Sequence, residues 1–471
     1  MSPKYDLVII GAGPGGYTAA VSAAKHGMKT ALVEAREVGG ACLNRGCIPT
    51  KTLLYSAELY REIKSGEGIG VNTEALSYDL GAMYRRKDEV VAGLRDGIEA
   101  LIRANKVDLV TGMAKVLSAS QVLVSSGGES TLLEASKVLI AVGSAPSRPP
   151  IEGIDLPGVV TSDGLLDAQA IDYKSLVIIG GGVIGVEFAS VFGALGCEVT
   201  IIEAAERIVP ALDRELSQNL SAILKKRGVL INTGCSVERI SLSGDDLCCR
   251  FTGKNGIREV AAQGVLVSVG RKPNTAELFG DGVHIVQSRG IIVDGRFETS
   301  EKGIYAIGDV IAGSIALAHT ASAQAHNVIA EMVGEKPPVS LSAVPSCVYT
   351  SPEIASVGLN AEEAKAQGVE VIVGKSPMSA NGKTVIERQD RSFVKLVFDA
   401  DSEILLGAQL MCSRASDIIS ELSSAVLNKL TICQLASVVR PHPTFSEAVS
   451  IAAEDAKERA VKKPSEQKGD A

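Results

Sequence analysis

Apolar and polar positions follow the same order in two stretches of the chain, residues 6–34 and 176–203. Each stretch opens with a short apolar run typical of a buried parallel strand, passes through a glycine-rich turn into an apolar helical segment, and closes with a second strand. In both copies, 23 residues separate the first glycine of the turn from an acidic residue at the end of the second strand. The pattern predicts a repeated strand–helix–strand unit and an α/β fold with parallel sheets.

The glycine-rich turns carry the first chemistry. Glycine stands at the first, third and sixth positions of each turn, which matches the GxGxxG fingerprint of dinucleotide binding because each turn follows a strand and opens a helix. The first glycine permits the tight turn, the second lets the backbone approach a pyrophosphate, and the third lets the helix pack on the strand. The glycines are Gly11, Gly13 and Gly16 in the first copy and Gly180, Gly182 and Gly185 in the second. We therefore predict two dinucleotide sites.

An acidic residue ends the second strand of each copy, Glu34 in the first and Glu203 in the second. Each carboxylate is placed to accept hydrogen bonds from adenosine-ribose hydroxyls, and a carboxylate repels a 2′-phosphate. Glu203 therefore favours NAD over NADP, although Arg207 lies nearby and weakens this preference. The competing interpretation is that both glutamates are solvated strand ends.

Two cysteines, Cys42 and Cys47, lie between the glycine turns in a glycine-flanked segment, just ahead of a helix that we expect to begin at Pro49. A thiolate at a helix N-terminus is stabilised, so such a pair is suited to thiol–disulfide exchange. A metal site would need a second cysteine or histidine pair at ligand spacing, and two buried free cysteines would not explain the glycines. Because a flavin exchanges electrons with both a dithiol and a nicotinamide, we predict FAD in the first site, NAD in the second and the cysteine pair against the flavin.

Thiol substrates also need a base, and the chain has five histidines. His442 stands between two prolines that fix the backbone, and Glu447 follows five residues later, where its carboxylate can orient the imidazole. The alternative is a histidine in a proline-rich turn with no catalytic role. His319 precedes a predicted helix and has no assigned role.

The rest of the pattern completes the fold. Charged residues at helical spacing predict an amphipathic helix over 82–105, and the proline-rich stretch 145–150 predicts a boundary. After Pro337-Pro338, strands mix with short helices, which predicts an α+β domain. The charged stretch 461–471 lacks an apolar face and is predicted to be a disordered tail.

Composition narrows the function classes. The formal net charge is −8, aromatic residues make up 4% and tryptophan is absent, which all count against a nucleic-acid surface. No stretch approaches the ~18 apolar residues of a membrane span, and nine cysteines are too few for a disulfide scaffold. We expect a soluble, cytoplasmic protein in a reducing compartment that binds neither nucleic acid nor membrane and holds no metal.

Several motifs together resemble those of the pyridine nucleotide–disulfide oxidoreductases, over roughly residues 5–460. The motifs are the Cys42–Cys47 segment, the second glycine turn continuing into Val186-Glu187, the run Ala306–Asp309 and the run His442–Glu447. Within the family, the sequence is most similar to the members that oxidise dihydrolipoamide with NAD. The resemblance implies two Rossmann-like dinucleotide-binding domains and a C-terminal α+β dimerisation domain.

The resemblance also implies a role for each matching residue. Cys47 would face the flavin as a thiolate, and Cys42 would exchange with the substrate. Lys51 would lie near flavin N5 and pair with Glu187, while Asp309 would bind the ribityl chain. Backbone near the cofactors is implied at Gly112, Ala114, Ala141, Gly143 and Ala318 for FAD, and at Ser236 and Gly270 for NAD.

In the family pattern, His442 and Glu447 would reach into the site of the partner subunit, so that only a homodimer would be active. The implied partners are lipoylated protein domains and the core of an α-keto-acid dehydrogenase or glycine cleavage complex. The implied division is a FAD-binding domain (1–147), an NAD-binding domain (148–275), a central domain completing the FAD site (276–343), an interface domain (344–460) and the tail (461–471).

Three positions depart from the family pattern. Ala41 replaces the usual threonine, Arg45 replaces an apolar residue between the cysteines, and Arg440 replaces a frequent second histidine. None removes a catalytic group, although Arg45 could alter the redox potential of the cysteine pair. Two other functions remain open: a reductase of the glutathione, mycothiol or trypanothione type, which would mostly use NADPH, or a component that acts chiefly by docking in a multienzyme complex.

Overall fold

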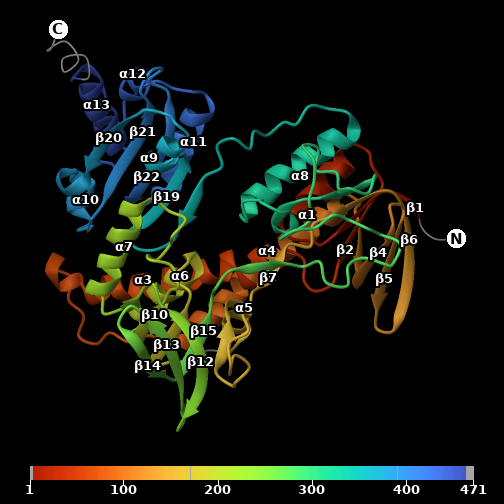
Figure 1. The fold of residues 1–471 in the computed structure, drawn as a ribbon, viewed down its shortest axis with the longest axis horizontal. Coiled ribbons are helices and arrows are strands. Elements are labelled where there is room, and N and C mark those ends of the chain that lie inside the picture. Colours follow the sequence, from red (N-terminus) through yellow and green to blue (C-terminus); the bar gives the residue numbers. More distant parts are fainter. Residues whose placement is uncertain (1–3, 170, 390, 463–471) are drawn as a thin grey trace.

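The computed structural model describes residues 4–169, 171–389 and 391–462. These residues form three lobes, each built around its own sheet (Figure 1). The N-terminal lobe lies on the right of Figure 1, the middle lobe at the bottom and the C-terminal lobe at the upper left. The order of lobes therefore follows the order of the two predicted repeats and the predicted α+β segment.

The N-terminal lobe holds a seven-stranded sheet of order β3-β2-β1-β6-β5-β4, in which β17 also pairs with β6. Strands β3, β2, β1, β6 and β17 run parallel, and β4 and β5 extend the sheet in antiparallel fashion. The strands are β1 (Lys4–Ile10), β2 (Thr30–Glu34), β3 (Asp108–Thr111), β4 (Met113–Ser118), β5 (Gln121–Ser126), β6 (Glu129–Ile140) and β17 (Ile304–Ala306). Apolar side chains of β1 lie fully buried because both faces of the strand are covered.

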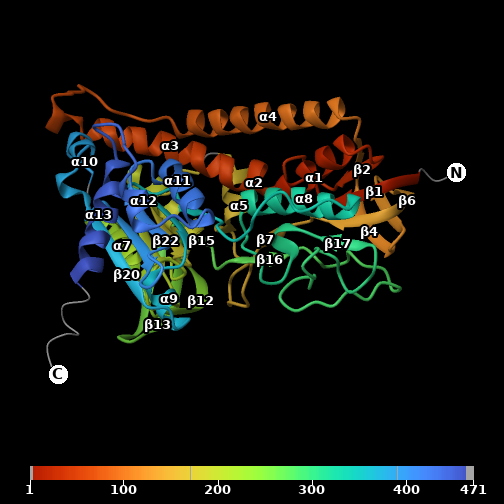
Figure 2. The same ribbon diagram turned by 90° about the horizontal axis from the view of Figure 1, so that it is seen from above.

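Helices from distant parts of the chain cover this sheet. They are α1 (Pro14–Lys25), α4 (Leu80–Ala104) and α8 (Ala318–Val333). Helix α3 (Cys47–Lys64) follows α2 (Gly40–Arg45) and packs on α4, and two short 3₁₀ turns are η1 (Gly66–Ile69) and η2 (Gly308–Val310). Figure 2 shows α4 running along one side of the molecule, with α3 beside it. Because α8 packs on α1 and β17 pairs with β6, the segment after the middle lobe returns to complete the first lobe.

The middle lobe repeats the arrangement with a five-stranded parallel sheet of order β11-β10-β9-β15-β8. Its elements are β8 (Val159–Thr161), α5 (Ser162–Asp167), β9 (Ser175–Ile179), α6 (Val183–Ala194), β10 (Glu198–Ile202), α7 (Arg214–Lys226), β11 (Leu230–Asn232) and β15 (Gly264–Val267). An antiparallel sheet packs against it, formed by β12 (Ser236–Ser243), β13 (Asp246–Gly253) and β14 (Gly256–Ala262). The short strands β7 (Ser144–Pro146) and β16 (Arg271–Pro273) pair with each other. They lie where the chain enters and leaves the middle lobe.

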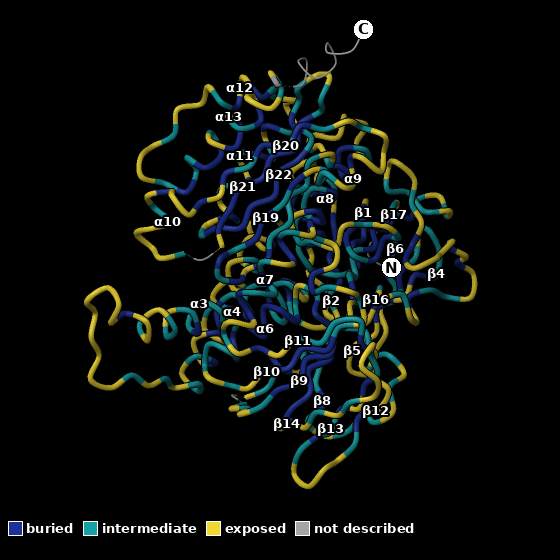
Figure 3. Tube along the Cα trace, turned by 60° about the vertical axis from the view of Figure 1, so that its left-hand side comes forward, coloured by how far each residue is buried: buried dark blue, intermediate teal, exposed yellow. Residues whose placement is uncertain are grey.

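The C-terminal lobe is an antiparallel sheet of order β18-β19-β22-β21-β20 covered by helices. The elements are β18 (Ser346–Val348), β19 (Glu353–Gly358), α9 (Ala361–Ala366), β20 (Val371–Pro377), η3 (Met378–Ala380), α10 (Gly382–Ile386), β21 (Phe393–Asp399), β22 (Leu405–Cys412), α11 (Ala415–Leu427), α12 (Ile432–Ala436) and α13 (Glu447–Lys462). In Figure 3, β21 and β22 of this sheet are mostly dark blue, as are β9 and β10 of the middle lobe.

One hydrophobic cluster crosses the lobes. It contains Leu53 of α3, Phe188 of α6, and Val348 and Met411 of the C-terminal sheet, all at most 2% exposed. Helix α6 is apolar on nearly all sides because it is enclosed between its own sheet and α3. The cysteine-bearing segment is therefore held against both other lobes.

The predicted fold class is confirmed, with two Rossmann-like sheets and an α+β C-terminal lobe. The helix expected over 82–105 is α4. Two local expectations were wrong: the helix predicted from Pro49 begins at Cys47, and positions 461 and 462 of the predicted tail belong to α13. The remainder of that tail, 463–471, lies outside the described residues. The sheet β12–β14 had no counterpart in the sequence pattern.

Candidate active site

The third glycine of each turn is fixed by close packing. A Cβ on Gly16 would lie 1.7 Å from the Gly11 carbonyl oxygen, and a Cβ on Gly185 would lie 2.0 Å from that of Gly180. The second glycines instead leave space: at Gly13 the nearest atom would be 3.8 Å away, and at Gly182 nothing lies within 4 Å. This is the arrangement that the fingerprint requires, because the backbone must stay open where a pyrophosphate approaches the helix N-terminus.

Both predicted glutamates hold their glycine turns. Glu34 Oε2 accepts a hydrogen bond from the Ala12 N–H at 2.7 Å. Glu203 accepts from the N–H groups of Gly181 and Ala205, both at 2.6 Å. These contacts exclude the interpretation that the two carboxylates are merely solvated strand ends. The contacts leave further lone pairs on each carboxylate for ribose hydroxyls.

Arg207 contacts the backbone of the loop that follows it. Its guanidinium donates to the carbonyl oxygens of Pro210, at 2.9 Å, and Leu212, at 3.3 Å. These bonds engage one terminal nitrogen, and the guanidinium keeps its positive charge. The expectation that Arg207 weakens the preference for NAD stays a prediction.

Cys42 and Cys47 lie on either side of the junction between α2 and α3. Cys47 is the first residue of α3, with Gly46 at the N-cap, and both cysteines are free thiols that line one cavity. A hydrogen bond from Cys42 and the positive charge of Lys51 lower the pKa of Cys47 from 9.0 to about 7, against burial, which raises it. The same hydrogen bond, together with burial, raises the pKa of Cys42 well above its ordinary value. The pair is polarised, with Cys47 favoured as thiolate and Cys42 as thiol.

Lys51 joins the three lobes beside Cys47. Its Nζ donates to both oxygens of Glu187, at 2.9 and 2.8 Å, and lies 4.7 Å from the ring centroid of Tyr349. The Glu187 side chain is 3% exposed and also accepts the Tyr349 N–H at 3.0 Å. A buried carboxylate of this kind needs such partners, and together they fix the ammonium group at the cavity wall.

The cavity has a volume of about 1260 Å³. Its lining includes Gly11, Gly13, Glu34, Cys42, Cys47, Lys51, Ala141, Gly143, Glu187, Asp309 and Ala318 from the predicted set. The other predicted residues do not line it: Gly16, Gly112, Ala114, Ser236, Gly270, Gly180, Gly182, Gly185, Glu203, His442 and Glu447. Ala114 is buried in the core of the first lobe, whereas the second glycine turn adjoins the cavity through Val183 and Ile184 at the start of α6.

A hydrogen-bonded chain leads from Asp309 to the middle lobe. Ser144 Oγ donates to Asp309 Oδ2 at 2.7 Å and accepts from Arg271 Nε at 2.8 Å. Arg271 also lies 3.9 Å from Asp163 of α5. Arg271 followed a predicted strand, but nothing in the sequence pointed to its contact with Ser144, 127 residues away.

Arg45 is neutralised by two carboxylates. Its guanidinium forms a forked pair with Glu37, at 2.9 and 3.0 Å, and a third hydrogen bond with Asp167 of α5 at 2.8 Å. Charges near Cys47 that shift its pKa come from Lys51 and Glu187, and Arg45 is not among them. The guanidinium therefore ties the cysteine segment to the middle lobe.

His442 lies away from the cysteines of its own chain. Its Nδ1 is 2.9 Å from Glu447 Oε1, and Glu447 Oε2 accepts the Thr444 N–H at 2.7 Å. The Thr444 N–H and then His442 lower the pKa of Glu447. The imidazole is 78% exposed and does not line the cavity. The predicted base and its orienting acid are thus brought together, but not with Cys42 and Cys47 of the same subunit.

Sequence reasoning missed Tyr349, Ser144 and the partners of Arg45. Tyr349 follows β18 and carried no signal in the sequence. Among the described residues, no group of three or more His, Cys, Asp or Glu side chains is arranged to hold a metal ion. Within the same residues, no helix combines the length and apolar character needed to cross a membrane.

Two dinucleotide-type turns and a polarised cysteine pair define a flavoprotein disulfide oxidoreductase. A family model described as pyridine nucleotide-disulphide oxidoreductase matches residues 5–325, and a model of the dimerisation domain of the same family matches residues 344–453. The chain belongs to this family, and its dimerisation domain indicates a homodimer.

Individual relatives agree with this assignment. The chain is 38% identical to a dihydrolipoyl dehydrogenase of Bacillus subtilis, over 98% of this chain and 100% of that protein. It is 40% identical to a dihydrolipoyl dehydrogenase of Chlamydia muridarum, over 95% and 96%. Among solved structures, the Cu(II) complex of the HOCl-induced flavoprotein disulfide reductase RclA of Escherichia coli superposes with a TM-score of 0.86 at 31% identity, covering 96% of this chain and 99% of that chain.

Proposed function

We propose that this protein is a dihydrolipoyl dehydrogenase, which oxidises dihydrolipoamide to lipoamide and reduces NAD to NADH. The observation that carries the proposal is the polarised cysteine pair, in which Cys42 keeps its proton while Cys47 is a thiolate beside Lys51. This is the state that a dithiol substrate would leave after it reduces a Cys42–Cys47 disulfide. The relatives named dihydrolipoyl dehydrogenase, which match nearly the whole chain, support this substrate.

The proposed exchange starts from the disulfide form. His442 of the partner subunit takes a proton from one substrate thiol, and the resulting thiolate attacks the sulfur of Cys42. The Cys42–Cys47 bond breaks and Cys47 leaves as thiolate. The second substrate thiol loses its proton and attacks the substrate sulfur that is bonded to Cys42. This attack closes the lipoamide ring and releases Cys42 as a thiolate, and Cys42 then takes up a proton. The substrate loses two electrons and the cysteine pair gains them.

The residues present fit both cofactors. The open backbone at Gly13 would receive the FAD pyrophosphate, Asp309 would bind the ribityl chain, and Lys51 would lie near the flavin ring. Bound there, FAD would supply a two-electron acceptor between the cysteine pair and the nicotinamide. We retain Gly112, Ala114, Ala141, Gly143 and Ala318 as backbone contacts to FAD.

We propose NAD rather than NADP for the second site. Glu203 presents a carboxylate where a 2′-phosphate would lie, and Arg207 is engaged by two carbonyl oxygens. Gly182 leaves open space for the pyrophosphate. Ser236 and Gly270 are retained as contacts to NAD.

We propose that the base is shared across the homodimer. His442 is exposed in its own chain, and Val439, three residues before it, is 95% exposed, which suits burial against a second subunit. His319 is the histidine among the residues lining the cavity, and its Nε2 already lies 2.8 Å from the Pro345 carbonyl oxygen. The cavity therefore needs an imidazole from elsewhere, and His442 with Glu447 fits that need.

The domain division given above and the partners remain parts of this proposal. The pairing of β17 with β6 supports residues 276–343 as the part that completes the FAD site, and the second family model begins at residue 344. The proposed partners are lipoylated domains and the core of an α-keto-acid dehydrogenase or glycine cleavage complex.

A steady-state comparison tests the substrate. Dihydrolipoamide with NAD should be turned over faster than oxidised glutathione with NADPH, and Cys42→Ser should abolish turnover of dihydrolipoamide while FAD stays bound. The second candidate is a disulfide reductase, which the likeness to RclA favours. Faster turnover of oxidised glutathione with NADPH, or retained turnover in Cys42→Ser, would reject the proposal.

Subunit mixing tests the shared base. Dimers of Cys42→Ser alone or of His442→Gln alone should be inactive with dihydrolipoamide. After unfolding and refolding together, a mixed dimer would hold one complete site, with cysteines from one subunit and His442 from the other. A random mixture should regain about one quarter of the wild-type activity, because about half of the dimers are mixed and each has one working site. No recovery would place the base within its own subunit.

A further inference from the structure

Arg440 is buried two residues before the exposed His442. Its side chain is 4% exposed, while that of His442 is 78% exposed. Val439, the residue before Arg440, is 95% exposed. The turn therefore carries one buried anchor, and the residues on either side of it point outward.

The guanidinium of Arg440 connects three helices. One nitrogen donates to the carbonyl oxygens of Leu435, at 3.4 Å, and Val438, at 3.3 Å, and to the Ser450 hydroxyl of α13. The other terminal nitrogen pairs with Glu421 of α11. Leu435 belongs to α12, so the contacts join α11, α12 and α13 around the turn.

The same turn is held on its far side by separate contacts. Thr444 donates from its hydroxyl to the Pro441 carbonyl at 2.8 Å, and Asn381 donates to the Thr444 carbonyl at 3.0 Å. Glu447, which orients the imidazole, is the first residue of α13, and Ser450 lies one turn further along that helix. Arg440 thus holds the helix that carries the orienting acid and the backbone that carries the base.

We infer that Arg440 is a positioning residue that fixes the His442–Glu447 pair for delivery to the cysteines of the partner subunit. The inference rests on the proposed function, in which His442 is the base. A forked guanidinium suits this task better than the histidine frequent at this position, because it satisfies two carbonyls, a hydroxyl and a carboxylate at once. Displacement of a catalytic group by ~1 Å lowers a rate by up to about 100-fold.

Two activities distinguish loss of His442 positioning from general loss of the folded enzyme. Oxidation of dihydrolipoamide by NAD needs His442, whereas reduction of ferricyanide by NADH takes electrons at the flavin and does not need the cysteines or the base. Arg440→Ala should lower kcat for dihydrolipoamide by about tenfold or more, with KM little changed, and leave the ferricyanide activity unchanged. Arg440→Lys, which keeps a charge for Glu421 but not the fork, should recover part of the loss.

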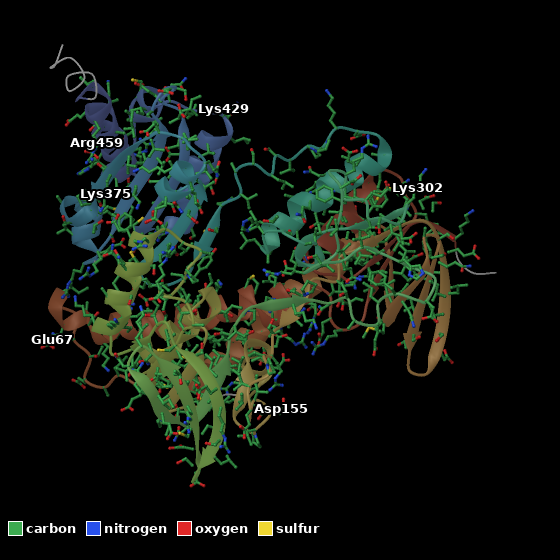
Figure 4. All side chains as sticks on the ribbon, in the orientation of Figure 1. Glu67, Asp155, Lys302, Lys375, Lys429 and Arg459 are labelled. Atoms are coloured by element: carbon green, nitrogen blue, oxygen red, sulfur yellow. The ribbon has the colours of Figure 1, made fainter. Side chains whose placement is uncertain are left out.

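The control is Arg459→Ala on the same helix α13. Arg459 forms an exposed pair with Asp455 at 3.0 Å and lies at the outer edge of the C-terminal lobe (Figure 4). Both activities of this variant should match those of the wild type. Size-exclusion chromatography should show that Arg440→Ala remains a dimer.

The outcomes distinguish a failure of the proposed base, His442, from a failure of the proposed positioning role of Arg440. If His442→Gln retains dihydrolipoamide turnover, the proposed base is wrong. If His442→Gln loses turnover while Arg440→Ala stays within twofold of the wild type, only the positioning role is overturned. Equal loss of both activities, or dissociation of Arg440→Ala and Arg440→Lys into monomers, would show a structural role and also overturn it. If Arg440→Ala does not fold, Arg440→Lys decides by the ratio of the two activities.

Discussion

Replacing Cys42 by alanine should return Cys47 to an ordinary thiol. The hydrogen bond from Cys42 is the largest of the influences that lower the pKa of Cys47, and burial, which raises it, exceeds the effect of Lys51. Without the bond, the pKa should rise from about 7 to 9.0 or above. The shift of two pKa units corresponds to about 2.7 kcal/mol of lost preference for the thiolate.

The expected change in reactivity follows from the thiolate fraction. At pH 7 the fraction of Cys47 present as thiolate would fall from about 50% to about 1%. A thiol of higher pKa is intrinsically more nucleophilic, by about 6- to 10-fold over two units, so the net rate of attack on a disulfide should fall about 5- to 8-fold. The pH midpoint of the reaction is therefore the clearer measurement, and it should move upward by about two units.

The assay is reaction of the reduced protein with 2,2′-dithiodipyridine between pH 5 and 10, with Cys47 followed by peptide mass spectrometry. The exposed thiol of Cys433 serves as an internal reference. Cys42→Ser is the matched variant, because its hydroxyl still donates a hydrogen bond and should keep the midpoint well below that of Cys42→Ala. A midpoint near 7 in Cys42→Ala would refute the reasoning and assign the low pKa to Lys51 alone.

Four further substitutions test other parts of the site. Lys51→Met should raise the pH midpoint of the Cys47 reaction and lower the free energy of unfolding in urea by about 3 kcal/mol, because it leaves the 3%-exposed Glu187 without its ammonium partner. A variant as stable as the wild type would contradict this. Gly16→Ala should abolish flavin content, whereas Gly185→Ala should weaken NADH binding in titration and leave flavin content intact, because each Cβ would meet a carbonyl oxygen at 2.0 Å or less. Arg45→Val should leave the pH midpoint of the Cys47 reaction unchanged. It should lower the free energy of unfolding by about 1 kcal/mol, since the carboxylates that it releases reach water. A shifted midpoint would show that Arg45 acts on the thiolate.

The features that sequence predicted best are those that depend on short spacing. Gly16 meets Gly11, and Glu34 meets Ala12, within a single strand–helix–strand unit whose order the pattern predicted, although it did not predict the bond between Glu34 and Ala12. The cysteine pair was equally local, five residues apart and flanked by glycine. Its helix begins at Cys47 rather than Pro49, which places the thiolate closer to the helix N-terminus than expected.

The features that sequence did not predict depend on lobes meeting in space. Tyr349 reaches Glu187 across 162 positions, and Arg45 reaches Asp167 across 122. Neither contact follows from hydrophobic periodicity, since each joins polar groups of separate lobes. The contacts of Arg207 were not predicted for a related reason: its partners are backbone carbonyls, which every residue carries.

The division of the chemistry follows from what each part of the site can stabilise. Cys42 and Lys51 stabilise a thiolate on Cys47 within one chain, so this chain alone can hold the reduced pair. Under the proposed function, the imidazole instead comes from the partner subunit, on an exposed turn where His442 contacts Glu447 and Arg440 pairs with Glu421. The acid–base half of the reaction would then depend on the dimer, whereas the thiolate half depends on groups of one chain.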